Sequence, residues 1–402
     1  MWTFFWVIIG IRLSLARGVS EDKGQPTSKA PLWQLDVRAL GYVHWAGPWE
    51  KIGRGGMDQI CFPTSSQVAI TYVTREAPGA LPRRGQSDAA LPFRLHALFV
   101  DTRSGLITGK REWPTASGQS GIVPAIGGEF IVVTPDKLML YSSALEILKE
   151  LELALGREAI DWRVAPSPGG KYLVVEFQPQ SDIARGAGYT DFEWRRLWIN
   201  AENLQVLRTW TERGISSHDW TISDDGLAFD GWKIGRPDGP REWLCLPYNN
   251  AKPYCGGYGS LLTNQIVFMM SWPPRDQWMA LISTSGEVLM HQDLLHGETF
   301  RKLVHSADGR RFALSLDKGK GGSAALDIAP HYSLNRIIVY DLAAREWIYT
   351  LDPKKQKIKA IHELALSPDG NLLGLITQDG MLQTYRIAET PHASAGGPGI
   401  PF

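Results

Sequence analysis

Short apolar runs separated by tight-turn sequences recur along this chain of 402 residues. The clearest example runs from Leu364 to Ile387, where three apolar stretches are separated by Ser367-Pro368-Asp369-Gly370 and by Asp379-Gly380. Apolar stretches of this length, punctuated by Pro-Asp-Gly and Asp-Gly, are typical of β-strands joined by hairpin turns. The pattern therefore predicts three consecutive antiparallel strands, which form one unit of a repeat.

Variants of this hairpin occur at seven positions, and an apolar run follows each of them. Intervals of about 42 to 45 residues match the four-stranded blade of a β-propeller, and the longer intervals require insertions. The sequence therefore predicts an all-β chain that folds as a seven-bladed β-propeller of four-stranded blades. The seven turns are Thr64–Ser66, Ile126–Gly128, Ser167–Gly170, Ser223–Gly226, Leu262–Asn264, Ser306–Gly309 and Ser367–Gly370.

The last unit lacks a fourth strand. We name the strands of a blade A to D from the centre outward, and expect A, B and C of the last blade near 360–366, 371–377 and 381–387. The alternating stretch Leu35–Leu40 precedes the first blade and belongs to none, so we expect it to supply the missing strand D. This closes the ring over residues 32–388 and removes an exposed sheet edge.

Arg-Glu-Trp occurs three times, at 111–113, 241–243 and 345–347, and each copy falls where an outer strand is predicted. A tryptophan at that position can cover the neighbouring blade with a large apolar face. We interpret the repeated tripeptide as packing between blades.

Two segments carry a resemblance to known repeat families. Residues 367–387 resemble WD40-type repeats, although the Trp-Asp and Gly-His pairs of that family are absent. Residues 99–105, together with Trp113, resemble a quinoprotein-type repeat, in which an Asp, a Gly and a Trp dock one blade onto the next. The resemblance implies the propeller fold, of an exported bacterial kind, and leaves the activity open. No cofactor is predicted, because the vicinal cysteine pair of quinone-dependent alcohol dehydrogenases is missing.

The two ends of the chain differ from the repeats. An apolar N-terminal run ends in a small-x-small site at Ala16, which predicts a signal peptide over 1–18 and a secreted or periplasmic protein. A retained anchor is less favoured, because the run before Arg12 is shorter than the ~20 residues that span a bilayer. A polar spacer is expected over 19–31 and a disordered tail over 389–402, with no membrane span after signal removal.

The net charge and the absence of common catalytic motifs limit the classes of function that fit this sequence. The 42 basic and 42 acidic residues balance, which argues against a nucleic-acid partner. Motifs of serine hydrolases, zinc peptidases and nucleotide-binding proteins are absent, and the Asp-Gly turns need no metal. We therefore favour a non-enzymatic, monomeric interaction propeller that binds a protein, small molecule or glycan. The alternative is an enzyme, a hydrolase, lyase or quinone-dependent oxidoreductase, with its site at the central channel mouth.

Candidate channel residues lie near the start of predicted innermost strands, where all blades converge. Contact with a ligand and a structural role in closing the channel mouth are both open for them. These residues are Asp161, His218, Asp219, Arg301 and His362.

The three largest insertions, Arg75–Pro92, Pro179–Asp191 and Asp317–Leu334, all fall between strands B and C of their blades. Because strand direction alternates, B–C connections emerge on one face of the ring together with the D–A connections. Their mixed aromatic, basic and small residues suit a recognition surface, so we predict that this face binds the partner. The alternative is that these loops merely tolerate insertion. The residues singled out are Arg83, Arg185, Tyr189 and Tyr332.

The chain has three cysteines. Cys245 and Cys255 bracket a connection between blades four and five, and in an exported protein this spacing predicts a disulfide. Cys61 lies on a predicted innermost strand and is expected to be a buried thiol outside that disulfide.

Overall fold

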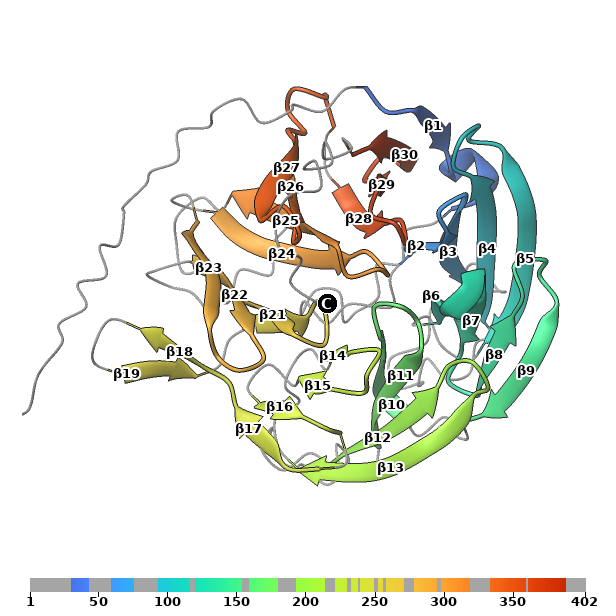
Figure 1. Ribbon diagram of the computed structural model, residues 1–402. Coiled ribbons are helices and arrows are strands. Elements are labelled where there is room, and N and C mark those ends of the chain that lie inside the picture. The colour runs from blue at the N-terminus through green and yellow to red at the C-terminus, as the bar shows by residue number, and fades with distance from the viewer. Residues whose placement is uncertain are drawn as a thin grey trace, which may run out of the picture.

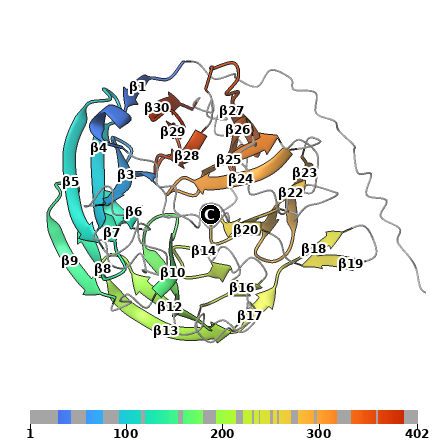
Figure 2. The ribbon, with the colours of Figure 1, turned by 180° about the vertical axis from the view of Figure 1, so that it is seen from behind.

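In the described part of the chain, seven four-stranded antiparallel sheets surround a central axis (Figures 1 and 2), which confirms the predicted seven-bladed β-propeller. The predicted signal peptide, almost all of the spacer and the tail lie outside the described residues. No helix within the described ranges is long and apolar enough to cross a membrane. The computed structural model describes residues 30–42, 59–75, 93–115, 120–153, 159–179, 193–213, 221–229, 233–237, 239–248, 252–255, 258–270, 278–294, 298–318, 333–358 and 361–387.

The first three blades follow one another in chain order, each running from the centre outward. Blade one is β2 (Ile60–Thr64), β3 (Gln67–Arg75), β4 (Phe93–Asp101) and β5 (Ile107–Thr115). Blade two is β6 (Gly121–Pro124), β7 (Phe130–Val133), β8 (Lys137–Tyr141) and β9 (Ile147–Glu152), with the 3-10 turn η4 (Ile126–Gly128) between β6 and β7. Blade three is β10 (Ala159–Pro166), β11 (Tyr172–Pro179), β12 (Glu193–Asn200) and β13 (Gln205–Arg213).

Blades four to seven continue the same order. Blade four is β14 (Thr221–Ile222), β15 (Ala228–Phe229), β16 (Lys233–Gly235) and β17 (Arg241–Trp243). Blade five is β20 (Tyr258–Leu261), β21 (Ile266–Met270), β22 (Trp278–Ser283) and β23 (Val288–Asp293). Blade six is β24 (Glu298–His305), β25 (Arg311–Lys318), β26 (Ser333–Asp341) and β27 (Glu346–Leu351). Blade seven is β28 (Ile361–Leu366), β29 (Leu372–Thr377), β30 (Met381–Arg386) and β1 (Trp33–Asp36).

The turn sequences that defined the repeat connect strands A and B in every blade. In blade seven the Ser367 hydroxyl donates to Asp369 at 2.6 Å and accepts the N–H of Leu372 at 2.9 Å. Gly370 has a φ of +66°, a conformation that residues with a Cβ rarely adopt. The local chemistry of Ser-x-Asp-Gly therefore favours the tight turn of the hairpin.

The N-terminal strand closes the ring as predicted. β1 pairs antiparallel with β30, with Leu35 opposite Leu382, and lies on the outside of blade seven (Figure 1). The strand is shorter than the predicted stretch Leu35–Leu40 because Asp36 Oδ1 accepts the N–H of Arg38 at 3.0 Å and turns the chain into the 3-10 helix η1 (Arg38–Leu40). Trp33 donates its indole N–H to the carbonyl of Thr102 in blade one at 2.7 Å, so the same strand joins blades seven and one.

Apolar contacts between neighbouring blades form the core. Phe99 of blade one meets Phe130 of blade two, and Trp113 donates to the Tyr141 hydroxyl across the same seam at 2.7 Å. Trp347 likewise reaches blade five through Gln292 at 2.9 Å. The expectation is wrong for the second Arg-Glu-Trp copy: Trp243 is 59% exposed, because the three-residue strand β17 ends at this residue on the rim.

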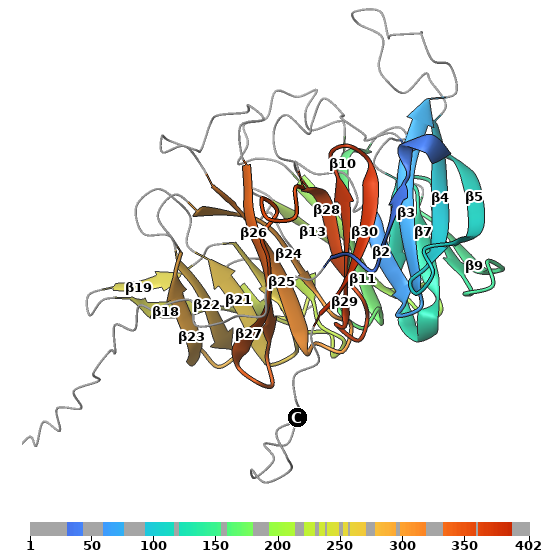
Figure 3. The same ribbon diagram turned by 90° about the horizontal axis from the view of Figure 1, so that it is seen from above.

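One element lies outside the blades. β18 (Cys245–Tyr248) and β19 (Lys252–Cys255) form a separate two-stranded sheet between blades four and five, and Figures 1 and 3 show it projecting from the rim. Cys245 lies directly opposite Cys255 in the register of this hairpin. The predicted connection is therefore a hairpin with the two cysteines at its base.

Candidate functional site

The two faces of the ring are built from different connections (Figure 3). In blade one only residues 65 and 66 separate β2 from β3, whereas residues 76–92 separate β3 from β4. Short A–B and C–D turns therefore lie on one face, which we call the turn face. The B–C and D–A connections lie on the opposite face, which we call the B–C face.

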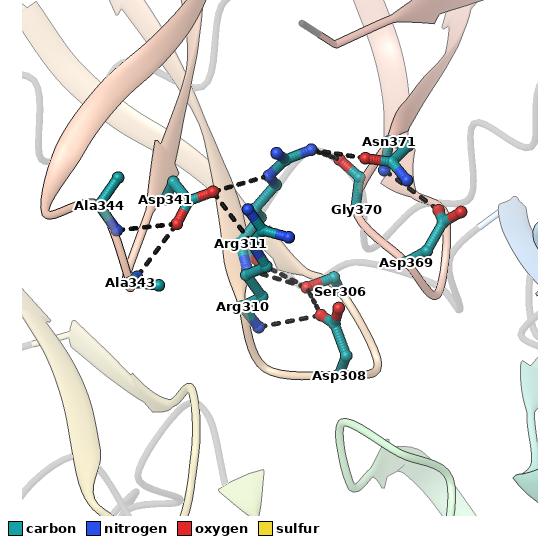
Figure 4. A network of polar contacts seen from close by, with 10 residues as sticks. All are labelled: Ser306, Asp308, Arg310, Arg311, Asp341, Ala343, Ala344, Asp369, Gly370 and Asn371. Atoms are coloured by element: carbon teal, nitrogen blue, oxygen red, sulfur yellow. Dashed lines mark hydrogen bonds and ion pairs between the residues drawn. The ribbon is translucent and has the colours of Figure 1, made fainter. Parts of the chain in front are cut away.

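Buried charge locks blades six and seven together on the turn face (Figure 4). The side chain of Arg311 is 1% exposed, and its Nε donates to Asp341 Oδ2 at 3.1 Å. Its Nη1 donates across the seam to the carbonyl of Gly370 at 3.1 Å and to Asn371 Oδ1 at 2.8 Å. This guanidinium is enclosed by protein groups, so its role is to join the two blades.

Neighbouring A–B turns bond to one another elsewhere on this face. Asp224 of blade four accepts the Ser167 hydroxyl at 2.5 Å and the N–H of Gly169 at 2.8 Å, both from blade three. Asn264 of blade five donates to Asp225 of blade four. The polar groups of the turn face thus serve contacts between blades.

The B–C end of blade one carries a chain of polar side chains. His96 lies between the Thr74 hydroxyl, 2.8 Å from Nε2, and Glu112 Oε1, 3.2 Å from Nδ1. Tyr72 stacks on the imidazole with ring centroids 4.7 Å apart, and burial followed by the Glu112 charge raises the pKa of this tyrosine. Arg94 Nη1 lies 3.6 Å from Glu112 Oε2. Hydrogen bonds thus link strands B, C and D at the base of the long connection.

Blade three has a buried ion-pair ladder at the corresponding end. Glu176 and Arg196 are opposite one another in β11 and β12, with Oε2 2.6 Å from Nε and side chains 5% and 3% exposed. Arg196 Nη1 then contacts Glu212 at 2.5 Å, and Glu212 contacts Arg241 of blade four at 2.8 Å. The ladder connects strands B, C and D and continues into the next blade.

Blade six has an ion pair at the same end, here between strand A and strand C. Glu298, 1% exposed, accepts two hydrogen bonds from Arg336, at 2.9 Å and 3.0 Å. Asp317 is also buried near the end of strand B. Buried charges are costly unless they are paired, so such pairs fix the strands that hold them in one register. Blades one, three and six each carry a long B–C connection, and each has a polar cluster at its base.

Strand length distinguishes the same three blades. Their B strands β3, β11 and β25 have 9, 8 and 8 residues, whereas β7, β15, β21 and β29 have 4, 2, 5 and 6. At about 3.3 Å per residue, the longer B strands continue roughly 7 Å or more beyond the shorter ones. Among the described residues, the B strands of these three blades extend furthest toward the B–C face, and we call these blades its corners.

The central channel is the second candidate site. It encloses about 560 Å³ and is lined by residues from all seven blades, most of them apolar. Arg163 and Glu176 of blade three and Lys302 and His305 of blade six add polar groups to the wall. The Lys302 ammonium pairs with Glu363 of blade seven, so charged groups bridge two blades beside the channel.

Three predicted channel residues lie at bulges of the innermost strands. The register of β24 skips Arg301, and that of β28 skips His362, so each is the extra residue of a β-bulge. In β10 the register shifts just before Asp161. His362 is half-buried, and the side chains of Asp161 and Arg301 are outside the described set. Bulges re-aim the next side chains, and here those are Lys302 and Glu363.

Other predicted site residues fall outside the description. His218, Asp219, Arg83, Arg185, Tyr189 and Tyr332 all lie in ranges that the structure does not describe. Cys61 is 8% exposed and lies on the channel wall. Among the described residues, no group of three or more His, Cys, Asp or Glu could hold a metal ion.

The charged residues at or beside the channel that sequence reasoning missed share a position in the repeat. Arg163, Lys302 and Glu363 each stand four residues before the serine that begins the A–B turn, as does Asp219. Aligning the repeats on that serine therefore reveals a charged position in four blades. In blades six and seven the sequence-based choice was the preceding residue, Arg301 or His362, which the bulge takes out of register.

Comparisons with known proteins concern the fold. A scan against protein-family models finds no match, and a search of the curated proteins finds none. Among solved structures, the chain is similar to the WD40 domain of Neurospora crassa Pan2, at 9% identity and TM-score 0.49, covering 91% of this chain and 98% of that one. It is similar to a chain of the mitotic checkpoint complex, at 10% identity and TM-score 0.48, with coverage of 90% and 98%. The C-terminal WD40 domain of Sif2 matches at 13% identity and TM-score 0.41, with coverage of 84% and 98%.

Proposed function

We propose that this propeller is a non-enzymatic interaction protein that recognises a protein partner through its B–C face. The observation that carries the proposal is the coincidence, in blades one, three and six, of long B–C connections, extended strands and polar clusters at their bases. These blades are two, three and two positions apart around the ring of seven. The three corners therefore surround the mouth of the central channel.

Physical chemistry favours this face over the other. Recognition residues are typically carried by loops on a rigid scaffold, and ion-paired strand ends provide a fixed base for such loops. The turn face uses its polar groups between blades, as Arg311 and Asp224 show. A stable protein interface covers roughly 800 Å² per partner, which requires elements from several blades acting together.

The test uses one shortened variant and one control. In the shortened variant, residues 76–92, 180–192 and 319–332 are each replaced by a two-residue turn. In the control, the exposed turn-face residues Arg103 and Glu202, in the C–D turns of blades one and three, are replaced by Ala. Each purified, tagged protein is used to capture partners from the cells that produce it, and captured proteins are re-tested as purified components.

We expect the wild type and the control to bind the same partner and the shortened variant to lose it. The midpoint of thermal unfolding should stay within a few degrees in all three, because the polar clusters lie below the deletions. The proposal is wrong if the shortened variant keeps the partner while the control loses it, or if no captured protein binds as a purified component.

A further inference from the structure

The wall of the central channel combines an apolar surface with a small number of charged groups. Its volume of about 560 Å³ falls within the range of roughly 300 to 1,000 Å³ that is usual for small-molecule sites. Ile60, Phe62, Leu303 and Leu364 are among the apolar residues that line it. Such a wall can cover the body of an organic ligand and exclude water from it.

Two cations face this space from different sides of the ring. Arg163 comes from blade three and Lys302 from blade six, three blade positions away. Both stand four residues before the turn serine of their strand, Ser167 and Ser306, so they lie at the same level of the channel. Strands β10 and β24, on different sides of the ring, thus place positive charge at the same level of the channel.

Acidic groups near the channel are already engaged by cations. Glu176 also lines the cavity and lies directly opposite Arg163 in the register of β10 and β11, and its carboxylate is held by Arg196 of β12 at 2.6 Å. Glu363 pairs with Lys302, whose ammonium has three N–H donors and can bond a second anion at the same time. Among the described residues that line the cavity, the cations are Arg163 and Lys302 and the carboxylate is Glu176.

We propose that the channel binds a small amphipathic anion, with an apolar body and a single carboxylate, sulfonate or phosphate head. The head lies between Arg163 and Lys302, and the body packs against the aliphatic and aromatic wall. Charge interactions are strengthened there because the surrounding strands lower the local dielectric constant. This site is separate from the B–C face, so it stands or falls independently of the proposed partner.

A matched series of probes tests the head-group preference. Naphthalene-2-carboxylate, 2-naphthylmethanol and 2-naphthylmethylammonium share one apolar body and differ in charge, and their binding to the full chain is measured by calorimetry. We expect the carboxylate to bind at least tenfold more tightly than the alcohol, and the ammonium to bind most weakly. Equal affinities for all three would overturn the proposal.

Cys61 reports where the probe binds, because it is one of the residues that line the channel. Its rate of alkylation by N-ethylmaleimide is followed by mass spectrometry of the peptide that contains it. Saturating naphthalene-2-carboxylate should slow this reaction at least fivefold. An unchanged rate would place the probe elsewhere and contradict the channel assignment.

Variants identify the two cations. Arg163→Gln removes one, and the double change Lys302→Gln with Glu363→Gln removes the other without leaving a lone charge. Each should weaken carboxylate binding about tenfold or more, as expected for a hydrogen bond to a charged group, and change the affinity for the alcohol less than twofold. Lys149→Gln on the exposed outer strand β9 is the matched control and should change neither the affinity for the carboxylate nor that for the alcohol. If a channel variant fails to fold, the probe series and the protection of Cys61 in the wild type still test whether the channel binds the anion.

Discussion

At the residue scale, two adjacent arginines make the same contact in different surroundings. Arg310 and Arg311 both reach Asp341 Oδ2, at 3.2 Å and 3.1 Å, but their side chains are 39% and 1% exposed. Asp341 is itself fully buried and also accepts the N–H groups of Ala343 and Ala344 (Figure 4). The pair therefore separates the effect of burial from the effect of ion pairing.

We predict that Arg311→Met lowers the free energy of unfolding by about 3 to 5 kcal/mol, because it leaves a buried carboxylate with less compensation. Arg310→Met should cost about 1 kcal/mol or less, since exposed ion pairs contribute little. Urea denaturation of both variants measures the difference. Equal losses would mean that the seam between blades six and seven does not depend on the buried guanidinium.

Asp101 predicts a pH dependence at the end of β4. The Ser104 hydroxyl and N–H, each at 2.7 Å, and the Arg103 N–H at 3.1 Å hold the pKa of Asp101 below its ordinary value. A carboxyl whose folded pKa is depressed stabilises the protein above its unfolded pKa, near 3.9, and loses that contribution as the pH falls through the folded pKa. The Asp101 carboxylate should therefore stabilise the folded protein at neutral pH and lose this contribution in acid.

The measurement compares wild type with Asp101→Asn by urea denaturation at pH 7, 5 and 3. The variant should be less stable at pH 7 and pH 5, and the difference should shrink as the pH approaches 3. Asp136→Asn, in the exposed B–C turn of blade two, is the control. A difference that grows in acid would contradict the assignment of the hydrogen bonds to the ionised carboxylate.

At the element scale, the hairpins were predictable because their turns are local. Ser367, Asp369 and Gly370 bond within a few residues, so the short sequence contains nearly all the information that folds it. The bulges at Arg301 and His362 were not predictable from the sequence, because a register shift depends on the neighbouring strand. The charged position of the repeat was visible in the sequence, yet the residues chosen in blades six and seven, Arg301 and His362, lie one position before it.

Strand ends show the same limit. Asp36 stops β1 through a hydrogen bond to the N–H of Arg38, and this bond overrides the apolar alternation that continues to Leu40. The exposure of Trp243 depends on how short blade four is, which the Arg-Glu-Trp tripeptide alone does not report. Local patterns thus predicted which strands exist and left their ends to tertiary contacts.

The projecting hairpin carries the prediction of a disulfide between Cys245 and Cys255. Directly opposed residues of antiparallel strands have Cβ atoms about 4.5 to 5.5 Å apart, close to the 3.5 to 4.5 Å that a disulfide needs. An isolated two-stranded hairpin is marginally stable, so a covalent link at its base would hold it, and closing this loop is worth about 2 to 3 kcal/mol.

Thiol counting tests the pairing. Protein exported with its N-terminal segment into an oxidising compartment, then denatured without reduction, should show one reactive thiol, in the peptide that contains Cys61. Non-reducing peptide mapping should join the peptides of Cys245 and Cys255. Three reactive thiols would contradict both the pair and the export from which it was predicted.

At the scale of the whole molecule, stability depends on closing a ring whose ends are far apart in sequence. β1 supplies strand D of blade seven, and Trp33 continues the contact into blade one through Thr102 and against Gly105. Each other blade is built from one continuous segment, so this seam is the only one among the described residues at which a blade combines both ends of the chain. Opening it exposes the edge of β30 and separates the first and last blades.

We therefore predict that deleting residues 30–42 destabilises the protein by several kcal/mol, whereas deleting residues 390–402 changes its stability little. Burial of a large aromatic side chain contributes roughly 2 to 3 kcal/mol, so Trp33→Ala should reproduce part of the loss, and Trp243→Ala on the exposed rim should not.

A circular permutant in which residues 30–42 follow residue 387, with the chain opened between residues 42 and 59, restores the closing strand as an ordinary C–D hairpin. This circular permutant should recover the stability of the wild type in urea denaturation. Equal tolerance of both deletions, or a permutant no more stable than the 30–42 deletion, would show that the ring holds without its N-terminal strand.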